Sequence, residues 1–126
     1  MTQEDKELLL KDLCARLPYG VKISIPELWT SEKKIEVLNE IFKGDDGEFR
    51  CNDSGMLIKY VKSYLFPLSS MTEEQKKEQE AHFTCIKHDM SFSICRYMEW
   101  CYKNHLDING LLSKGLANDA TGLNIY

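Results

Sequence analysis

The segment Tyr64–Gln75, YLFPLSSMTEEQ, decides how the chain divides into strands and helices. Its first part is almost purely apolar, and Pro67 cannot donate the backbone hydrogen bond that a continuing strand or helix needs. Thr72 and Gln75 have the spacing of a capping box, in which two side chains satisfy free backbone N–H groups at a helix start. The segment therefore predicts mostly strands and turns before it and helices after it.

A helix is predicted within residues 1–18. Thr2 fits its N-cap, and Asp5 places an acid in the first turn, where the helix dipole favours negative charge. Pro18 and Gly20 should end the helix near Leu17. Its apolar stripe recurs at three- and four-residue steps: Leu9, Leu10, Leu13, Cys14 and Leu17.

Residues 21–66 are expected to form the β part of the chain. Val21, Ile23 and Ile25 alternate with polar residues, which is the period of a half-buried strand. Residues 33–42 fit either a helix or a strand by the spacing of their apolar side chains. The turn at residues 44–47, followed by a short β-like run, favours a hairpin and hence strands. Residues 56–65 return to a β-branched and aromatic composition.

Residues 72–126 are expected to be helical. A highly charged helix should run from Thr72 to about Phe83, and a second from about Phe92 to Asn104. The second has one apolar face, made by Ile94, Tyr97, Met98, Cys101 and His105. The prediction is a single α+β domain, as suits 126 residues. It has an N-terminal helix, a small antiparallel sheet or open SH3-like barrel, and C-terminal helices packed on it.

Charge and composition limit the classes of partner and the location that we expect for the protein. The net charge is −4, and each half carries −2, with 10 basic and 12 acidic groups in residues 1–66 and 6 and 8 in residues 67–126. Nucleic-acid binding depends on clustered cations, so it is not expected. The N-terminus lacks the features of a signal peptide, and no apolar run suits a membrane span. Five cysteines, an odd number, predict reduced thiols and a cytoplasmic location.

A zinc site is the sharpest chemical candidate. Cys85 and His88 form one pair, Cys101 and His105 a second, and thiolate with imidazole is a good zinc ligand set. The ligand order differs from that of the common zinc finger, and the intervening segment has the pattern of a helix. Cys101 also lies on the apolar face, where a free cysteine packs as a small apolar group. We expect core packing and no cofactor, with zinc binding as the alternative.

Catalytic motifs are missing from the sequence. Cys101 and His105 could form a nucleophile and base, but no oxyanion-hole or acid motif accompanies them. The acids near residues 45–53 fit tight turns better than a calcium loop. We therefore expect no enzyme. Trp29 lies in a predicted loop, and an exposed tryptophan commonly anchors an interface, although covering the edge of a small core is the alternative.

A resemblance to a known family rests on three segments and two short motifs. The segments are DLCARLPYGV at 12–21, YLFPLSSMTEE at 64–74 and WCYKNH at 100–105, and the motifs are Gly110-Leu111 and Gly115–Ala117. Together they resemble a family of short bacterial proteins of unknown function from anaerobic gut bacteria, their prophages and mobile elements. That family commonly has Asp-Tyr-Arg-Gly-Leu where this chain has Asp107-Ile108-Asn109-Gly110-Leu111, so a role of the arginine does not carry over to Asn109. The cysteine and histidine set is not part of the family pattern.

The functional prediction is a non-enzymatic accessory factor of phage or mobile-element origin that binds another protein. The region from Trp29 to Gly55 is the divergent part of the resemblance. Since loops on a fixed scaffold tolerate change, the partner surface is expected there.

Overall fold

A computed structural model describes residues 1–26, 33–88 and 90–126, so Trp29 lies outside the described residues. Helix α1 (Gln3–Arg16) begins as predicted, since the Thr2 hydroxyl accepts a hydrogen bond of 3.1 Å from the Asp5 backbone N–H. A short 3₁₀ helix, η1 (Leu17–Tyr19), follows α1. It ends at Gly20, whose φ of +67° favours a residue without a side chain.

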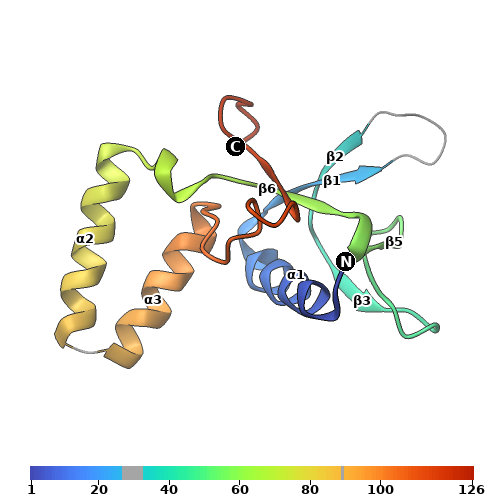
Figure 1. The fold of residues 1–126 in the computed structure, drawn as a ribbon, viewed down its shortest axis with the longest axis horizontal. Helices are drawn as coiled ribbons and strands as arrows, with labels where there is room; N and C mark the ends of the chain where they lie inside the picture. The colour runs from blue at the N-terminus through green and yellow to red at the C-terminus, as the bar shows by residue number, and fades with distance from the viewer. Residues whose placement is uncertain (27–32, 89) are drawn as a thin grey trace.

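The larger sheet has four strands in the order β2-β1-β6-β7. Its strands are β1 (Lys22–Pro26), β2 (Lys33–Val37), β6 (Lys62–Leu65) and β7 (Ala117–Asp119). Strand β1 pairs antiparallel with both β2 and β6, whereas β6 and β7 are parallel. The last strand comes from the part of the chain predicted to be helical, so the sheet joins the two halves of the sequence (Figure 1).

The smaller sheet is antiparallel and has the order β3-β4-β5, with β3 (Ile41–Lys43), β4 (Phe49–Cys51) and β5 (Met56–Leu57). Residues 33–42 therefore contain two strands, which settles their ambiguity. The run predicted as β-like at residues 56–65 is interrupted by a 3₁₀ helix, η2 (Ile58–Tyr60). Asn52 links the two sheets, because its side chain bonds the backbone of Asn39 and of Val37, both at 2.9 Å.

The apolar core lies between α1 and the sheets. Leu9 and Leu13 of α1 are almost completely buried, so this part of the predicted stripe faces the protein's own core. The rest of the stripe does so less or not at all, because Leu10 and Leu17 are partly buried and Cys14 is exposed. The other fully buried apolar side chains come from the strands and the residues beside them, from the end of α3 and from the segment after it: Val21, Ile23, Leu38, Cys51, Val61, Leu65, Cys101, Leu106, Leu111 and Ala120. The fold is thus α+β, as predicted.

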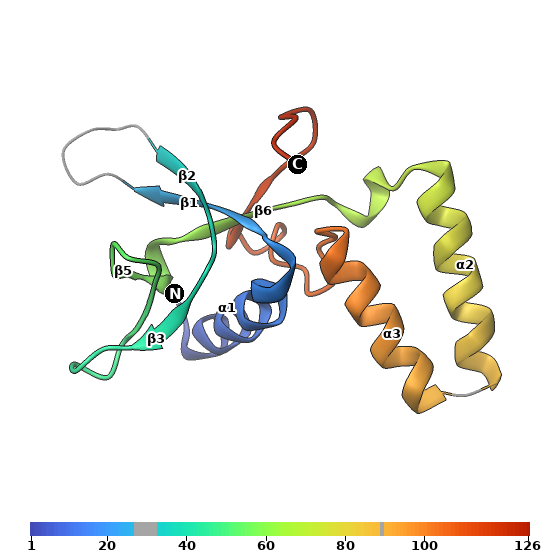
Figure 2. The same cartoon turned by 180° about the vertical axis from the view of Figure 1, so that it is seen from behind.

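Helices α2 (Glu73–His88) and α3 (Met90–Lys103) form a hairpin. The predicted capping box is present at its start. Thr72 N–H donates to Gln75 Oε1 at 3.0 Å, and Gln75 N–H donates to Thr72 Oγ1 at 3.1 Å. The hairpin extends away from the rest of the molecule, with α2 on its outer side (Figures 1 and 2). We call α1, the two sheets and residues 104–126 the body.

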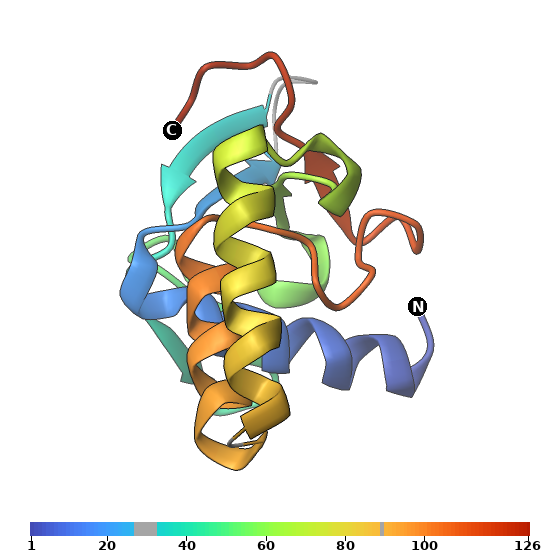
Figure 3. The same cartoon turned by 90° about the vertical axis from the view of Figure 1, so that its left-hand side faces the viewer.

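Residues 104–126 return to contact α1 and the larger sheet. Phe66 and Leu106 form a β-bridge, and residues 111–115 form turns before β7, in a region predicted to be helical. The end view shows α2 and α3 side by side, with α2 nearer the viewer (Figure 3). Among the described residues, no helix is long and apolar enough to cross a membrane.

Candidate functional site

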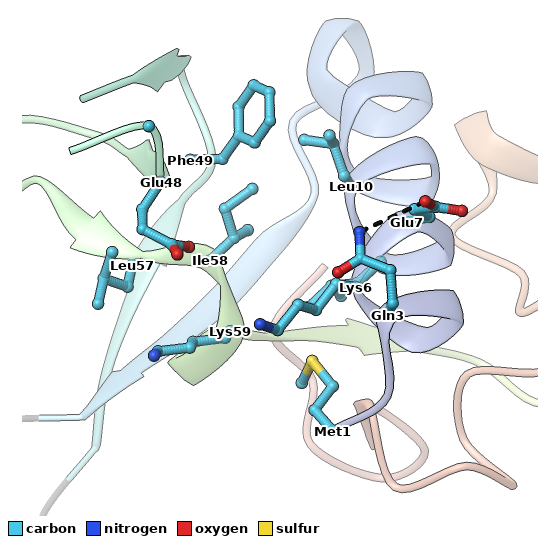
Figure 4. A pocket seen from close by; sticks show the side chains of 12 residues that line it. Met1, Gln3, Lys6, Glu7, Leu10, Glu48, Phe49, Leu57, Ile58 and Lys59 are labelled. Carbon is cyan, nitrogen blue, oxygen red and sulfur yellow. Dashed lines mark hydrogen bonds between the residues drawn. The ribbon is translucent and has the colours of Figure 1, made fainter. Parts of the chain in front are cut away.

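A groove of about 330 Å³ opens between α1 and the smaller sheet (Figure 4). Its deepest side chains are Leu9 and Ile58, which are almost fully buried. Leu10 and Phe49 face each other across its upper part, and Phe49 is 37% exposed. The groove therefore offers a partly solvent-exposed apolar surface that the fold itself does not cover.

Polar side chains surround this apolar surface. Lys6 extends from α1 across the groove toward Ile58, and Lys59 lies on the opposite wall (Figure 4). Glu48 lies on the strand side, while Glu7 accepts a hydrogen bond of 3.4 Å from Gln3. An apolar centre within a polar rim is the usual anatomy of a protein interface. Two lysines and two glutamates leave the rim without a strong preference for either sign of charge.

The structure does not bring the four predicted zinc ligands together. Cys85 and His88 lie exposed on α2. Cys101 is buried at the root of α3, and His105 follows that helix in the body. Within residues 1–26, 33–88 and 90–126, no three His, Cys, Asp or Glu side chains are placed to hold a metal ion.

The nucleophile and base pair is not assembled either. Burial raises the pKa of the Cys101 thiol, which disfavours the reactive thiolate. The ring of His105 stacks on Tyr126 with the ring centres 3.7 Å apart. Burial, with Arg16 and Lys22 nearby, lowers the pKa of His105 to about 4. The two side chains are thus engaged in packing.

A buried ion pair fixes the junction between α1 and the segment after α3. Asp12 and Arg16 are both fully buried, and Arg16 Nε lies 2.8 Å from Asp12 Oδ2. Arg16 Nη2 also donates to the Leu106 carbonyl at 2.7 Å, and Asn109 Nδ2 donates to Asp12 Oδ1 at 2.9 Å. The guanidinium group lies 5.0 Å from the centre of the Tyr102 ring. The cluster is closed to solvent, so its role is to hold the fold.

This cluster was missed by the sequence analysis. Its only local signal was the four-residue spacing of Asp12 and Arg16, which surface ion pairs share. Asn109 supplies a neutral amide to the carboxylate of Asp12. The contact joins residues 97 positions apart, which no local pattern reveals.

Comparison with known proteins gives no assignment: no protein-family model, no curated protein and no solved structure matches this chain.

Proposed function

We propose that the protein is a non-enzymatic accessory factor that binds another protein through the groove between α1 and the smaller sheet. The observation that carries this proposal is the apolar interior of the groove, with Phe49 partly exposed above Leu9 and Ile58. Exposed aromatic side chains that can enter or receive a partner's apolar side chain contribute disproportionately to interface energy.

The position of the groove also supports the proposal. One wall contains Gly47, Glu48 and Phe49, which belong to the region from Trp29 to Gly55 that the sequence analysis selected. The opposite wall is α1, whose inner side packs in the core. A loop region that faces a rigid helix can change its partner without changing the scaffold. The groove suits a protein segment that presents an apolar side chain between polar neighbours.

The resemblance to short proteins of prophages and mobile elements supports the accessory role and the cytoplasmic location. A small protein can serve a phage or mobile element by occupying a surface of a larger protein.

The test is affinity capture from bacterial lysate, with mass spectrometry to identify partners. Phe49→Ser should reduce the yield of a specific partner about tenfold, the effect of losing about 1.4 kcal/mol of binding free energy. Phe92→Ser is the matched control, because Phe92 is a more exposed phenylalanine on α3, outside the groove. Equal capture by the wild type and the Phe49→Ser variant would refute the groove as the binding site.

Trp29 provides a second, independent variant. Trp29→Ala should weaken capture of the same partner and leave the thermal unfolding temperature unchanged, because the sequence places this residue in a loop. A fall of more than about 4 °C, equivalent to roughly 1 kcal/mol in a chain of this size, would instead assign Trp29 to the core.

A further inference from the structure

The side chain of Tyr126 is bound between two strands of the larger sheet. After β7, residues 121–126 turn back toward β6 (Figure 1). The direct pairing of β1 with β6 stops one residue before Lys22 and Tyr64. There the Tyr126 hydroxyl accepts a hydrogen bond of 2.8 Å from the Lys22 backbone N–H and donates one of 2.7 Å to the Tyr64 carbonyl. One backbone donor and one backbone acceptor therefore recognise the phenol hydroxyl.

Two aromatic side chains contact the ring of Tyr126. His105 stacks on it with the ring centres 3.7 Å apart and the planes 15° apart, and the Phe66 ring lies 5.8 Å away, tilted by 52°. His105 follows α3 with a φ of +58°, a position at helix ends that glycine usually occupies. Strained non-glycine residues of this kind are concentrated at ligand-binding positions.

The main chain beside the tyrosine is bound as well. Lys22 Nζ donates a hydrogen bond to the Ile125 carbonyl and lies 5.8 Å from the centre of the Tyr126 ring. The hydroxyl, the ring and the preceding carbonyl thus each have a partner. We give the name tyrosine socket to the residues that supply these contacts: Lys22, Tyr64, Phe66 and His105.

The rest of the segment is attached weakly. Residues 121–124 are exposed, and among the described residues their hydrogen bonds go to Asp119 and Ala120, just before them. Only the next two residues bond to β1 and β6, and Tyr126 itself remains 43% exposed. Because the attachment is concentrated in one side chain and one carbonyl, the segment can open locally while β7 stays paired.

We propose that the tyrosine socket is a binding site for a tyrosine in an extended segment of a partner protein, and that Tyr126 occupies it in the free protein. The socket shares no residue with the groove, so this site goes beyond the proposed function. Tyr126 defines the chemistry of the ligand: a phenol, its ring and the main-chain carbonyl before it.

The contacts of the hydroxyl make the socket selective. A phenylalanine would leave the Lys22 N–H without its acceptor and the Tyr64 carbonyl without its donor, which costs binding free energy. A phosphotyrosine has no proton for the Tyr64 carbonyl and would place negative oxygens against it. The socket should therefore accept tyrosine and reject both of these side chains.

An NMR titration of the full chain with the peptide acetyl-GLNIY-amide, which copies residues 122–126, tests the proposal. The signals to follow are the Lys22 backbone amide and the His105 ring. Tyr126→Ala frees the socket and should bind the peptide with a Kd of about 1 mM. The wild type should bind at least about tenfold more weakly, because its own tyrosine competes at millimolar effective concentration. Tyr60→Ala, which removes an exposed tyrosine outside the socket, is the matched control and should behave as the wild type.

Two further peptides test the selectivity. Replacing the tyrosine by phenylalanine should weaken binding to Tyr126→Ala about tenfold, and phosphorylating the tyrosine should abolish it. If circular dichroism shows that Tyr126→Ala is unfolded, Tyr126→Phe takes its place. This variant keeps the ring but loses the hydroxyl, so it should bind the tyrosine peptide more tightly than the wild type does.

Lys22 and His105 signals that stay unchanged in the folded variant up to about 5 mM peptide would overturn the proposal. Equal binding of the tyrosine and phenylalanine peptides would do the same, as would equal binding by the wild type and Tyr126→Ala. Phe49→Ser should leave the titration as in the wild type, so failure here is separate from failure of the groove.

Discussion

The body and the α2–α3 hairpin are stabilised by different kinds of contact. The body surrounds Leu9, Leu13 and their neighbours with apolar side chains and closes the Asp12–Arg16 pair away from water. The hairpin is held by contacts at the surface. Gln79 donates to the Tyr97 hydroxyl at 2.9 Å, and the His82 ring lies 5.4 Å from that of Trp100.

Helix α2 shows the consequence of this difference. It has 16 residues, and none of them is buried. Helical stability in proteins comes mainly from packing an apolar face, so α2 depends on α3 and on its own cap more than α1 does. The hairpin should therefore open locally at a lower free energy than the body. The hairpin is a peripheral arm suited to contacts, and the body sets the global stability.

The largest effect is expected from breaking the buried ion pair of the body. Asp12→Ala should lower the free energy of unfolding by about 3–5 kcal/mol, because Arg16 would be left buried without its counter-charge. Urea denaturation followed by circular dichroism measures the loss. Lys11→Ala, an exposed change in the same helix, should stay within about 0.5 kcal/mol. A loss below 1 kcal/mol for Asp12→Ala would show that water reaches Arg16.

A smaller effect, the dependence of the free energy of unfolding on pH, is expected from a histidine of the body and not from one of the hairpin. The pKa of His105 in the body is lowered from 6.5 to about 4 by burial first and by Arg16 and Lys22 next. Between these values the unfolded chain binds more protons than the folded one, so stability falls as pH falls from about 6.5 to about 4. Allowing for partial solvent contact of the ring, the loss is about 2 kcal/mol.

His105→Asn should remove most of this pH dependence. Asparagine tolerates the φ of +58° at this position, so the backbone can be kept. His88→Asn changes an exposed histidine of the hairpin and should leave the dependence as in the wild type. Urea unfolding at pH 4.5, 5.5 and 7 measures how the free energy of unfolding changes with pH in the wild type and in the two variants. Identical slopes for His105→Asn and the wild type would assign the acid sensitivity to other groups.

Much of the fold could be predicted because its signals are local. The Thr72–Gln75 capping box, the alternation from Val21 to Ile25 and the leucine stripe of α1 each depend on residues within a few positions of one another. These patterns also gave the α+β class and both C-terminal helices. Helix α2 is longer than predicted, reaching His88 rather than Phe83, because contacts of its second half with α3, such as that of His82 with Tyr97, stabilise it.

The parts that could not be predicted depend on distant residues. Strand β7 has only three residues and pairs with β6, more than 50 positions earlier. The hydroxyl of Tyr126 donates to the Tyr64 carbonyl across 62 positions. The apolar face predicted for α3 also divides between different neighbours. Tyr97 turns toward α2, whereas Cys101 enters the body and Ile94 stays exposed.

The groove could not be predicted either, because it too depends on residues that are distant in sequence. Its walls are α1 and strand β4, which are about 40 residues apart in sequence, and no periodicity could place Leu10 opposite Phe49. The resemblance pointed to the stretch of chain that supplies one wall, but it gave no reason to join that stretch to α1. Paired cysteine and histidine spacings, in contrast, suggested a site that the tertiary structure does not assemble.

The smallest predicted effect concerns the cap of the hairpin. Thr72→Ala removes the hydroxyl that accepts from Gln75 N–H, which should weaken the start of α2 by about 1 kcal/mol. Because α2 opens locally, its amides should exchange with deuterium about five times faster, whereas those of β1 and β6 should keep their wild-type rates. Hydrogen exchange followed by mass spectrometry measures both. Equal acceleration in β1 and β6 would mean that hairpin and body unfold as one unit, and that the weak packing of α2 does not make it an independent arm.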